Sequence, residues 1–131
     1  MKNVLITGAS RGIGAACAER FSEAGYRVFI TYNNSEKEAM DIAKNIKGIP
    51  VQCDVSKKDE VLDMVSFINK NYGSISVLVN NAGISQQKMF CDITEDDWDM
   101  MMDVNLKSMY LVTHAVLDDM VREKYGRIIN I

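Results

Sequence analysis

The sequence predicts an α/β fold, a doubly wound parallel sheet with helices on both faces. Two observations carry this prediction: short apolar runs alternate with amphipathic stretches along the whole chain, and the connections between them are short. Such alternation favours parallel strands joined by right-handed crossover helices. The length of 131 residues fits one domain, and no internal repeat, low-complexity tract or linker divides it. We therefore expect a single domain over residues 1–131.

Apolar runs are predicted as strands at residues 4–6, 27–31, 51–55, 75–79 and 127–131. The first run ends at Thr7 and Gly8 and suits a strand that is covered on both faces. The second is rich in β-branched and aromatic residues, which are enriched in strands. Pro50 stands at the entrance of the third, where its missing N–H does little harm. The fourth is expected to break at Asn80.

Apolar residues at helical spacing fill the intervals between these runs. The first helix is predicted to begin at Gly12 and to stop at Gly25. Its apolar stripe is formed by Ile13, Ala16, Cys17 and Phe21. The second is predicted to begin at Ser35, with Glu38 at the spacing of a capping box, and to end at Gly48. Its stripe is formed by Ala39, Ile42, Ala43 and Ile46.

The third helix is predicted to begin after a cap at Ser56 and to end at Tyr72. Its stripe is formed by Val61, Met64, Val65 and Ile68. A longer helical region follows the predicted cap Thr94 and reaches about Lys124. Asparagine is unfavourable inside a helix, and we expect two helices that join near Asn105.

Composition excludes several kinds of partner. The formal net charge of −3 leaves no basic face for nucleic acid. No leader-like start and no apolar run of membrane-spanning length is found, which predicts a cytoplasmic protein without a membrane partner. The three cysteines lack CxxC spacing, and His114 is the only histidine. We expect reduced thiols that pack as small apolar groups, and no metal site.

The strongest motif is a glycine-rich turn at residues 7–14, Thr-Gly-Ala-Ser-Arg-Gly-Ile-Gly, between a predicted strand and a predicted helix. In this context Gly8 permits a tight turn, Gly12 removes a side chain where a diphosphate approaches, and Gly14 lets helix and strand pack closely. The helix N-terminus offers unpaired N–H donors and a positive dipole end to the anion. The alternative is a glycine turn without a ligand.

The spacing Thr-Gly-x-x-x-Gly-x-Gly resembles that of the short-chain dehydrogenase/reductase family. Residues 53–55, 80–83, 104–105 and 126–131 match further motifs of that family in the same order. The resemblance covers the whole chain and implies a Rossmann sheet of strand order 3-2-1-4-5. It also implies an N-terminal part only, truncated after the fifth strand, without the later catalytic and substrate-binding segment.

The same resemblance implies a set of cofactor contacts. Asp54 is expected to accept a hydrogen bond from the adenine amino group, beside the backbone of Val55. Asn80, Ala82 and Gly83 belong to a segment that lines the adenine ribose and steadies the sheet. The expected cofactor-binding residues are Gly8, Ser10, Arg11, Gly12, Ile13, Gly14, Tyr32, Asn33, Asp54, Val55, Asn81, Ala82 and Gly83. Alternatives remain open: Asp54 as a cap of the next helix, and the two asparagines as a solvated turn.

The end of the second strand predicts the choice of cofactor. An NAD site needs an acid there for the ribose 2′-OH, and Thr31-Tyr32-Asn33-Asn34 contains none. Arg11 can instead pair with a 2′-phosphate, a contact worth about 1.5–3 kcal/mol. We therefore predict NADP(H). The alternative is that Arg11 is a surface charge without a ligand.

Asn105 resembles one member of the family's Asn-Ser-Tyr-Lys catalytic set, in which the asparagine holds a water in a proton relay. A solvent-facing asparagine is the alternative. The family resemblance implies an NADP(H)-dependent carbonyl/alcohol oxidoreductase. The sequence resembles that of the bacterial 3-oxoacyl-[acyl-carrier-protein] reductases of fatty acid biosynthesis, and this resemblance implies a small carbonyl or acyl-thioester substrate.

No tyrosine of the chain has a lysine four residues on, and the serine of the set is also missing. Loss of a positioned acid–base group costs about 10²- to 10⁴-fold, which predicts negligible turnover by this chain alone. The second hypothesis is a non-catalytic dinucleotide-binding module or sensor.

The fifth run is expected to form an exposed apolar edge with Ile128, Ile129 and Ile131. Unpaired strand edges invite pairing with another chain. The methionine-rich stretch near Met101 is expected to serve as core or interface packing. We therefore expect a homo-oligomer.

Overall fold

The computed structural model describes residues 1–131 and contains one parallel sheet of five strands in the order β3-β2-β1-β4-β5. The strands are β1 (Asn3–Ile6), β2 (Arg27–Tyr32), β3 (Ile49–Gln52), β4 (Ile75–Asn80) and β5 (Arg127–Asn130). All neighbouring strands pair in parallel. The predicted fold class and strand order are confirmed.

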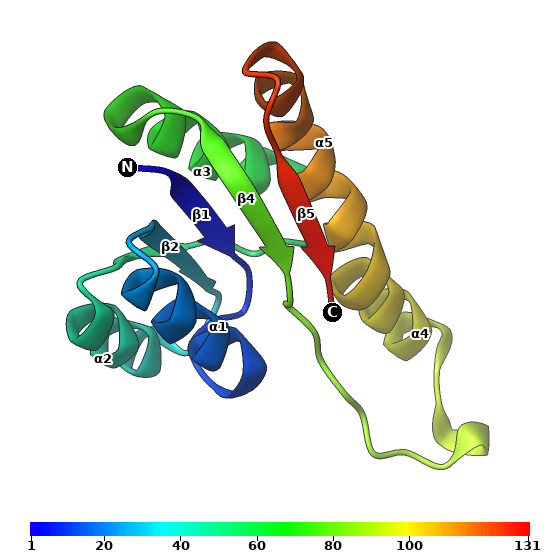
Figure 1. Ribbon diagram of the computed structural model, residues 1–131. Helices are drawn as coiled ribbons and strands as arrows, with labels where there is room; N and C mark the ends of the chain where they lie inside the picture. Colours follow the sequence, from blue (N-terminus) through cyan, green and yellow to red (C-terminus); the bar gives the residue numbers. More distant parts are fainter.

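Helices cover both faces of the sheet (Figure 1). The helices are α1 (Gly12–Glu23), α2 (Glu36–Ile46), α3 (Lys58–Tyr72), α4 (Glu95–Met102) and α5 (Ser108–Arg122), with a short 3₁₀ turn, η1 (Phe90–Asp92), and a π-helical turn, η2 (Asp103–Lys107). Alternate residues of the strands pack on opposite sides. Leu5 lies in a core cluster with residues of α3 and α5, whereas Val4 and Ile6 lie in a second cluster with residues of α1 and α2. None of the helices combines the length and apolar character that a membrane crossing requires.

The sheet order reverses between β1 and β4, and this reversal positions the site. β1 pairs with β2 on one side and with β4 on the other, so the chain leaves the carboxyl ends of β1 and β4 in different directions. Such a switch point opens a crevice outside the carboxyl ends of the strands. The glycine-rich turn follows β1 directly at this place.

The predicted apolar stripe of α1 was partly wrong. Ile13 and Ala16 are exposed, and the buried residues of the helix are Gly14, Ala15 and Ala18. The reason is close packing: this helix faces the sheet through its smallest side chains, so hydrophobic size does not mark its buried face. By contrast, Val61, Met64, Val65 and Ile68 are all buried in α3, as predicted.

Ser35 is the N-cap of α2, as predicted, but one capping box, one helix start and one strand were predicted wrongly. Ser35 precedes α2 without a side-chain capping bond, so the Ser35–Glu38 capping box does not form, and Lys57 rather than Ser56 is the N-cap of α3. The third strand covers Ile49–Gln52 instead of residues 51–55. Pro50 lies inside it, which is tolerated because β3 is an edge strand of the sheet.

Thr94 is the N-cap of α4, as predicted, and it forms a complete capping box. Thr94 Oγ1 accepts from Asp97 N at 3.1 Å, and Asp97 Oδ2 accepts from Thr94 N at 3.0 Å. Lys88 Nζ lies 2.7 Å from the same carboxylate oxygen. The hydrogen bond from Lys88, together with that from Thr94, lowers the pKa of Asp97 from 3.8 to about 2.

Because the carboxylate of Asp97 stabilises the start of α4, we expect this part of the helix to be sensitive to acid. Because the folded pKa of Asp97 is depressed, its stabilisation is present above pH 4 and is lost as the pH falls toward 2. We expect the protection of the Thr94 and Asp97 amides, relative to their intrinsic exchange rates at each pH, to fall over that interval. Asp97→Asn should remove the pH dependence, while Asp96→Asn, in the same helical turn, should keep it. A protection factor at Thr94 that stays constant from pH 4 to 2 would contradict the assignment.

Candidate functional site

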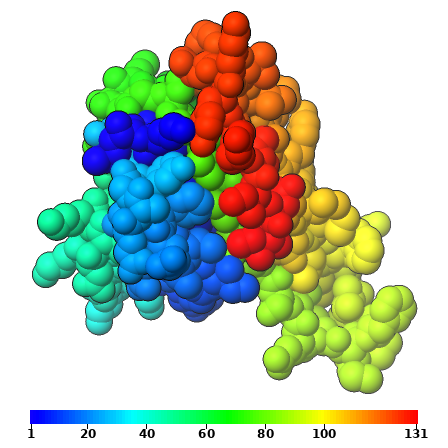
Figure 2. All heavy atoms as spheres, in the orientation of Figure 1, coloured from blue at the N-terminus to red at the C-terminus, as the bar shows by residue number.

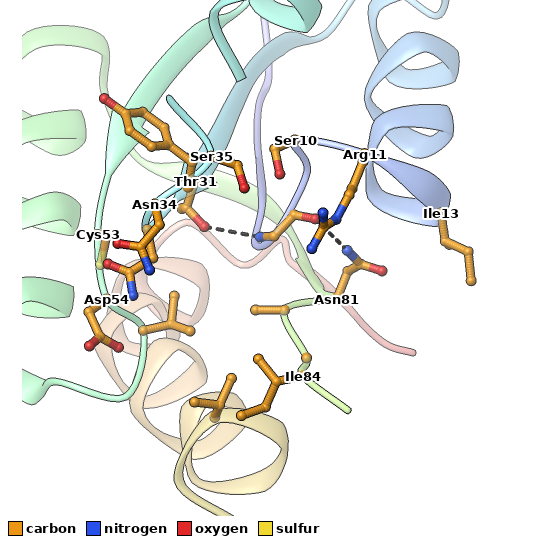
Figure 3. A pocket seen from close by; sticks show the side chains of 17 residues that line it. Ser10, Arg11, Ile13, Thr31, Asn34, Ser35, Cys53, Asp54, Asn81 and Ile84 are labelled. Carbon is orange, nitrogen blue, oxygen red and sulfur yellow. Dashed lines mark hydrogen bonds between the residues drawn. The ribbon is translucent and has the colours of Figure 1, made fainter. Parts of the chain in front are cut away.

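A cavity of about 480 Å³ opens at the carboxyl ends of the strands (Figure 3). Its 17 lining residues come from the turn after β1, the end of β2, the segment after β3, the loop after β4 and the π turn. They are Gly8, Ser10, Arg11, Ile13, Thr31, Tyr32, Asn33, Asn34, Ser35, Cys53, Asp54, Val55, Asn81, Ala82, Gly83, Ile84 and Val104. Most of the predicted cofactor residues therefore lie around one cavity; Gly12 and Gly14 support it from the adjoining turn without lining it.

Two glycines of the turn are required by its geometry. Gly8 has a φ of +65°, and a Cβ there would lie 2.7 Å from Ala82 Cα. A Cβ at Gly14 would lie 2.5 Å from Asn81 Nδ2 and 2.8 Å from Ala9 Cα. Any side chain at either position would push the turn away from the loop after β4, so both glycines keep the two segments in contact.

The backbone amides of this turn divide into two groups. Thr7 N donates to Val79 O, Gly8 N to the Thr31 hydroxyl and Ala9 N to Thr31 O. Beyond them the amides without an acceptor in the protein are those of Ser10, Arg11, Gly12, Ile13 and Gly14. These free N–H groups lie at the N-terminus of a 12-residue helix that has no acidic residue in its first turn. Such an end attracts anions through its donors and its dipole.

The asparagines after β4 hold the turn in place. Asn81 Nδ2 donates to Thr7 O at 3.1 Å and to Gly8 O at 2.9 Å, and the amides of Asn81 and Ala82 both donate to Thr7 Oγ1. Asn80 is buried and donates to Asn130 Oδ1. The alternative of a solvated turn is therefore wrong. The structural role of Thr7 was not predicted, although its hydroxyl at the end of a buried strand is a signal for it.

Asp54 serves the local turn and still borders the cavity. Its Oδ1 accepts from Ser56 N at 3.0 Å and from Ser56 Oγ at 2.6 Å, just before α3. Asp54 therefore orders the turn before α3 but does not cap that helix, whose N-cap is Lys57, so the alternative of a helix cap is wrong. Its other carboxylate oxygen has no hydrogen-bond partner in the protein and can accept from a ligand.

The end of β2 carries amide, hydroxyl and phenol groups but no acid. Tyr32, Asn33, Asn34 and Ser35 line this part of the cavity. Arg11 stands across from them, exposed and without an ion pair or hydrogen bond to the protein. The guanidinium of Arg11 is therefore free to pair with an additional anionic group of a ligand, and neutral hydrogen-bonding side chains lie across the cavity from it.

Asn105 lies in the π turn between α4 and α5, where the break in the helix was predicted. Its Oδ1 accepts from Ile84 N at 2.7 Å, and its Nδ2 donates to Ile84 O at 2.9 Å. It is half-buried and holds the loop after β4, so the alternative of a solvent-facing side chain is wrong. Ile84 and Val104 line the cavity beside it.

Cys53 lies in the motif at residues 53–55 and lines the cavity, although no role was predicted for it. Burial, followed by the nearby charges of Glu60 and Asp54, raises the pKa of its thiol from 9.0 to about 12. A thiol with such a pKa stays protonated at neutral pH and is a poor nucleophile. Cys53 therefore contributes packing to the cavity. The three cysteines are all free, and no group of three or more potential metal ligands is found.

The fold and the site together define a doubly wound α/β protein with a row of free amides at the glycine turn, beside a cavity at the carboxyl ends of the strands. The model of the short chain dehydrogenase family matches residues 2–131, and the chain belongs to this family. The reductase resemblance noted in the sequence is thus confirmed at the family level.

Individual relatives are also similar over the whole chain. The 3-oxoacyl-[acyl-carrier-protein] reductases FabG of Staphylococcus epidermidis and Staphylococcus aureus are 38% and 36% identical, and that of Buchnera aphidicola subsp. Baizongia pistaciae is 34% identical; each match covers 99% of this chain. The chain spans about half the length of these curated relatives, 54–55%. A solved metagenomic short-chain oxidoreductase in complex with NADP has a TM-score of 0.90 and 32% identity, over 98% of this chain and 60% of that one.

Proposed function

We propose that residues 1–131 form one dinucleotide-binding domain that holds NADP(H) for a carbonyl/alcohol oxidoreductase of the short-chain family. The observation that carries this proposal is the row of free amides from Ser10 to Gly14 at the start of α1. These amides can donate to a diphosphate without breaking any hydrogen bond inside the protein. The adenine and its ribose would then lie toward Asp54, Val55, Ala82 and Gly83.

Cofactor choice rests on the free cation of Arg11 and on the absence of an acid at the end of β2. A ribose 2′-phosphate would meet Arg11 with Tyr32, Asn33 and Ser35 close by. Ser35 supports this placement because its side chain makes no capping bond to α2. The NADP-bound structure of a similar short-chain oxidoreductase supports it as well.

The substrate proposed is a small carbonyl compound of the 3-oxoacyl thioester class, as the names of the FabG relatives suggest. Asn105 would act in the proton relay of the family's catalytic set. The chain has no tyrosine four residues before a lysine, and we therefore propose that it binds cofactor with negligible turnover by itself. Free cysteines throughout support a reducing compartment such as the cytoplasm.

The second candidate is a non-catalytic dinucleotide-binding module or sensor. Residues 1–131 contain no Tyr-x-x-x-Lys pair, and these residues alone would bind the dinucleotide without hydride transfer. The two candidates differ in whether a serine and a Tyr-x-x-x-Lys pair complete the site. Transfer of hydride from bound NADPH to a 3-oxoacyl thioester by the full gene product would decide for the reductase, and cofactor binding without transfer would decide for the module.

The proposed cofactor is tested by calorimetric titration of the chain with NADPH and with NADH. We expect NADPH to bind the more tightly, by about tenfold to a hundredfold for one charge-assisted contact. Equal or tighter binding of NADH would overturn the choice of NADP(H). Absence of binding of either nucleotide would overturn the dinucleotide site itself.

Self-association is the further expected property of the chain. β5 is an edge strand whose Ile128 and Ile129 are exposed, and it lies open at the surface in Figure 2. We propose that this edge pairs with another copy. Light scattering at rising concentration should report association, and Ile129→Lys should reduce it. Met40→Lys, at an equally exposed position of α2, should not. A monomer at every concentration would contradict the proposal.

A further inference from the structure

Thr31 contacts the glycine turn with two of its atoms. It lies on β2 beside β1 and is 1% exposed. Its hydroxyl oxygen accepts from Gly8 N at 3.1 Å, the bond drawn in Figure 3, and its carbonyl oxygen accepts from Ala9 N at 3.3 Å. These two residues of the turn are thereby tied to β2 rather than to their own strand.

Both polar backbone atoms of Gly8 are therefore held by side chains from opposite sides. Its N–H is bound by Thr31 on β2, and its carbonyl oxygen accepts from Asn81 Nδ2, which follows β4, at 2.9 Å. Between these two contacts Gly8 has a φ of +65°. A glycine has no side chain to restrict it, so the two neighbouring side chains supply the restriction.

The division between bound and free amides falls directly after these contacts. Thr7, Gly8 and Ala9 donate inside the protein, and the free amides begin at Ser10. We propose that Thr31 is a positioning residue for the dinucleotide: it orients the turn so that the N–H groups from Ser10 onward face the ligand. This inference rests on the proposed cofactor function and adds to it a residue outside the glycine motif.

Removal of the hydroxyl alone tests the role. In Thr31→Val the β-branched shape suits the strand, but Gly8 N loses its acceptor in a half-buried place. That amide would then turn toward water in the cavity and carry the following peptides with it. Thr31→Ser keeps the hydroxyl and should rescue binding. Thr113→Val is the matched control, because Thr113 Oγ1 also accepts one N–H, from Asn80 Nδ2, away from the cavity.

We expect titration by NADPH fluorescence to give about tenfold weaker binding for Thr31→Val, equivalent to about 1.4 kcal/mol. The dissociation constants of Thr31→Ser and Thr113→Val for NADPH should stay within about threefold of the wild-type value, which is less than the expected tenfold effect. Unchanged binding by folded Thr31→Val would overturn the inference while leaving the proposed function intact. Failure of the wild type to bind NADPH would instead overturn the proposed function.

Amide hydrogen exchange of the wild type supplies the second measurement and does not depend on how the variant folds. Gly8 and Ala9 should be protected, whereas Ser10 to Gly14 should exchange rapidly until NADPH is added. Rapid exchange at Gly8 in the free protein would overturn the inference even where Thr31→Val does not fold.

Discussion

Replacement of Gly8 by alanine is expected to remove cofactor binding and to destabilise the fold more than any other single change to the turn. The added Cβ meets Ala82 Cα at 2.7 Å, and the φ of +65° is unfavourable for any L side chain. The left-handed conformation costs about 1–2 kcal/mol, and overpacking costs about 1–3 kcal/mol more. The free energy of unfolding should therefore fall by about 2–5 kcal/mol.

The effect on binding follows from the same contact. Relief of the clash moves the turn away from the loop after β4, and the free amides then no longer point at one place. We expect the affinity for NADPH to fall by more than about a hundredfold, or about 2.7 kcal/mol. Urea unfolding and NADPH titration measure the two effects separately.

Gly25→Ala is the matched control for this prediction. Gly25 also has a positive φ, +85°, but a Cβ there meets nothing within 4 Å, and it lies away from the cavity. The free energy of unfolding of Gly25→Ala should fall only by the conformational cost, about 1–2 kcal/mol. Its affinity for the cofactor should be unchanged. If Gly8→Ala binds NADPH as the wild type does, the contact between the turn and Ala82 has no part in forming the site.

Replacement of Arg11 by glutamine is expected to have the second largest effect, and only on one cofactor. The guanidinium of Arg11 has no partner in the protein, so its removal leaves no charge unpaired. The loss of one charge-assisted contact to a 2′-phosphate costs about 1.5–3 kcal/mol. The affinity for NADPH should fall by about tenfold to a hundredfold, and the affinity for NADH should stay the same.

Arg20→Gln provides the comparison on the same helix. Arg20 pairs with Glu23 at 2.6 Å on an exposed surface, outside the cavity. The same change of charge at Arg20 should leave both affinities unchanged. If Arg11→Gln lowers the affinities for NADPH and NADH equally, Arg11 acts only through a general electrostatic effect. If it lowers neither affinity, Arg11 does not contact the cofactor.

Apolar periodicity predicted most of the fold because burial dominates the choice of strand and helix in a doubly wound sheet. It worked for α3, whose large apolar side chains form the inner face. It was wrong for α1, which faces the sheet through its small residues Gly14, Ala15 and Ala18. It also missed the start of β3, because Pro50 is unfavourable in a strand unless that strand is at an edge.

The candidate site was predictable where one stretch of sequence contains the whole arrangement. The glycine turn and the asparagines after β4 are of this kind. Thr31 and Ile84 could not be found in this way, because strand pairing and loop packing bring them to the cavity. The hydroxyl of Thr31 meets an amide 23 positions earlier in the chain, and no local pattern encodes that contact.

A heteronuclear NMR titration of the labelled chain with NADPH tests the central claim most directly. The account predicts that the amide signals of Ser10, Arg11, Gly12, Ile13 and Gly14 shift together and saturate, and that NADH produces the same pattern at higher concentration. If millimolar NADPH leaves these signals in place, the turn after β1 does not bind a diphosphate.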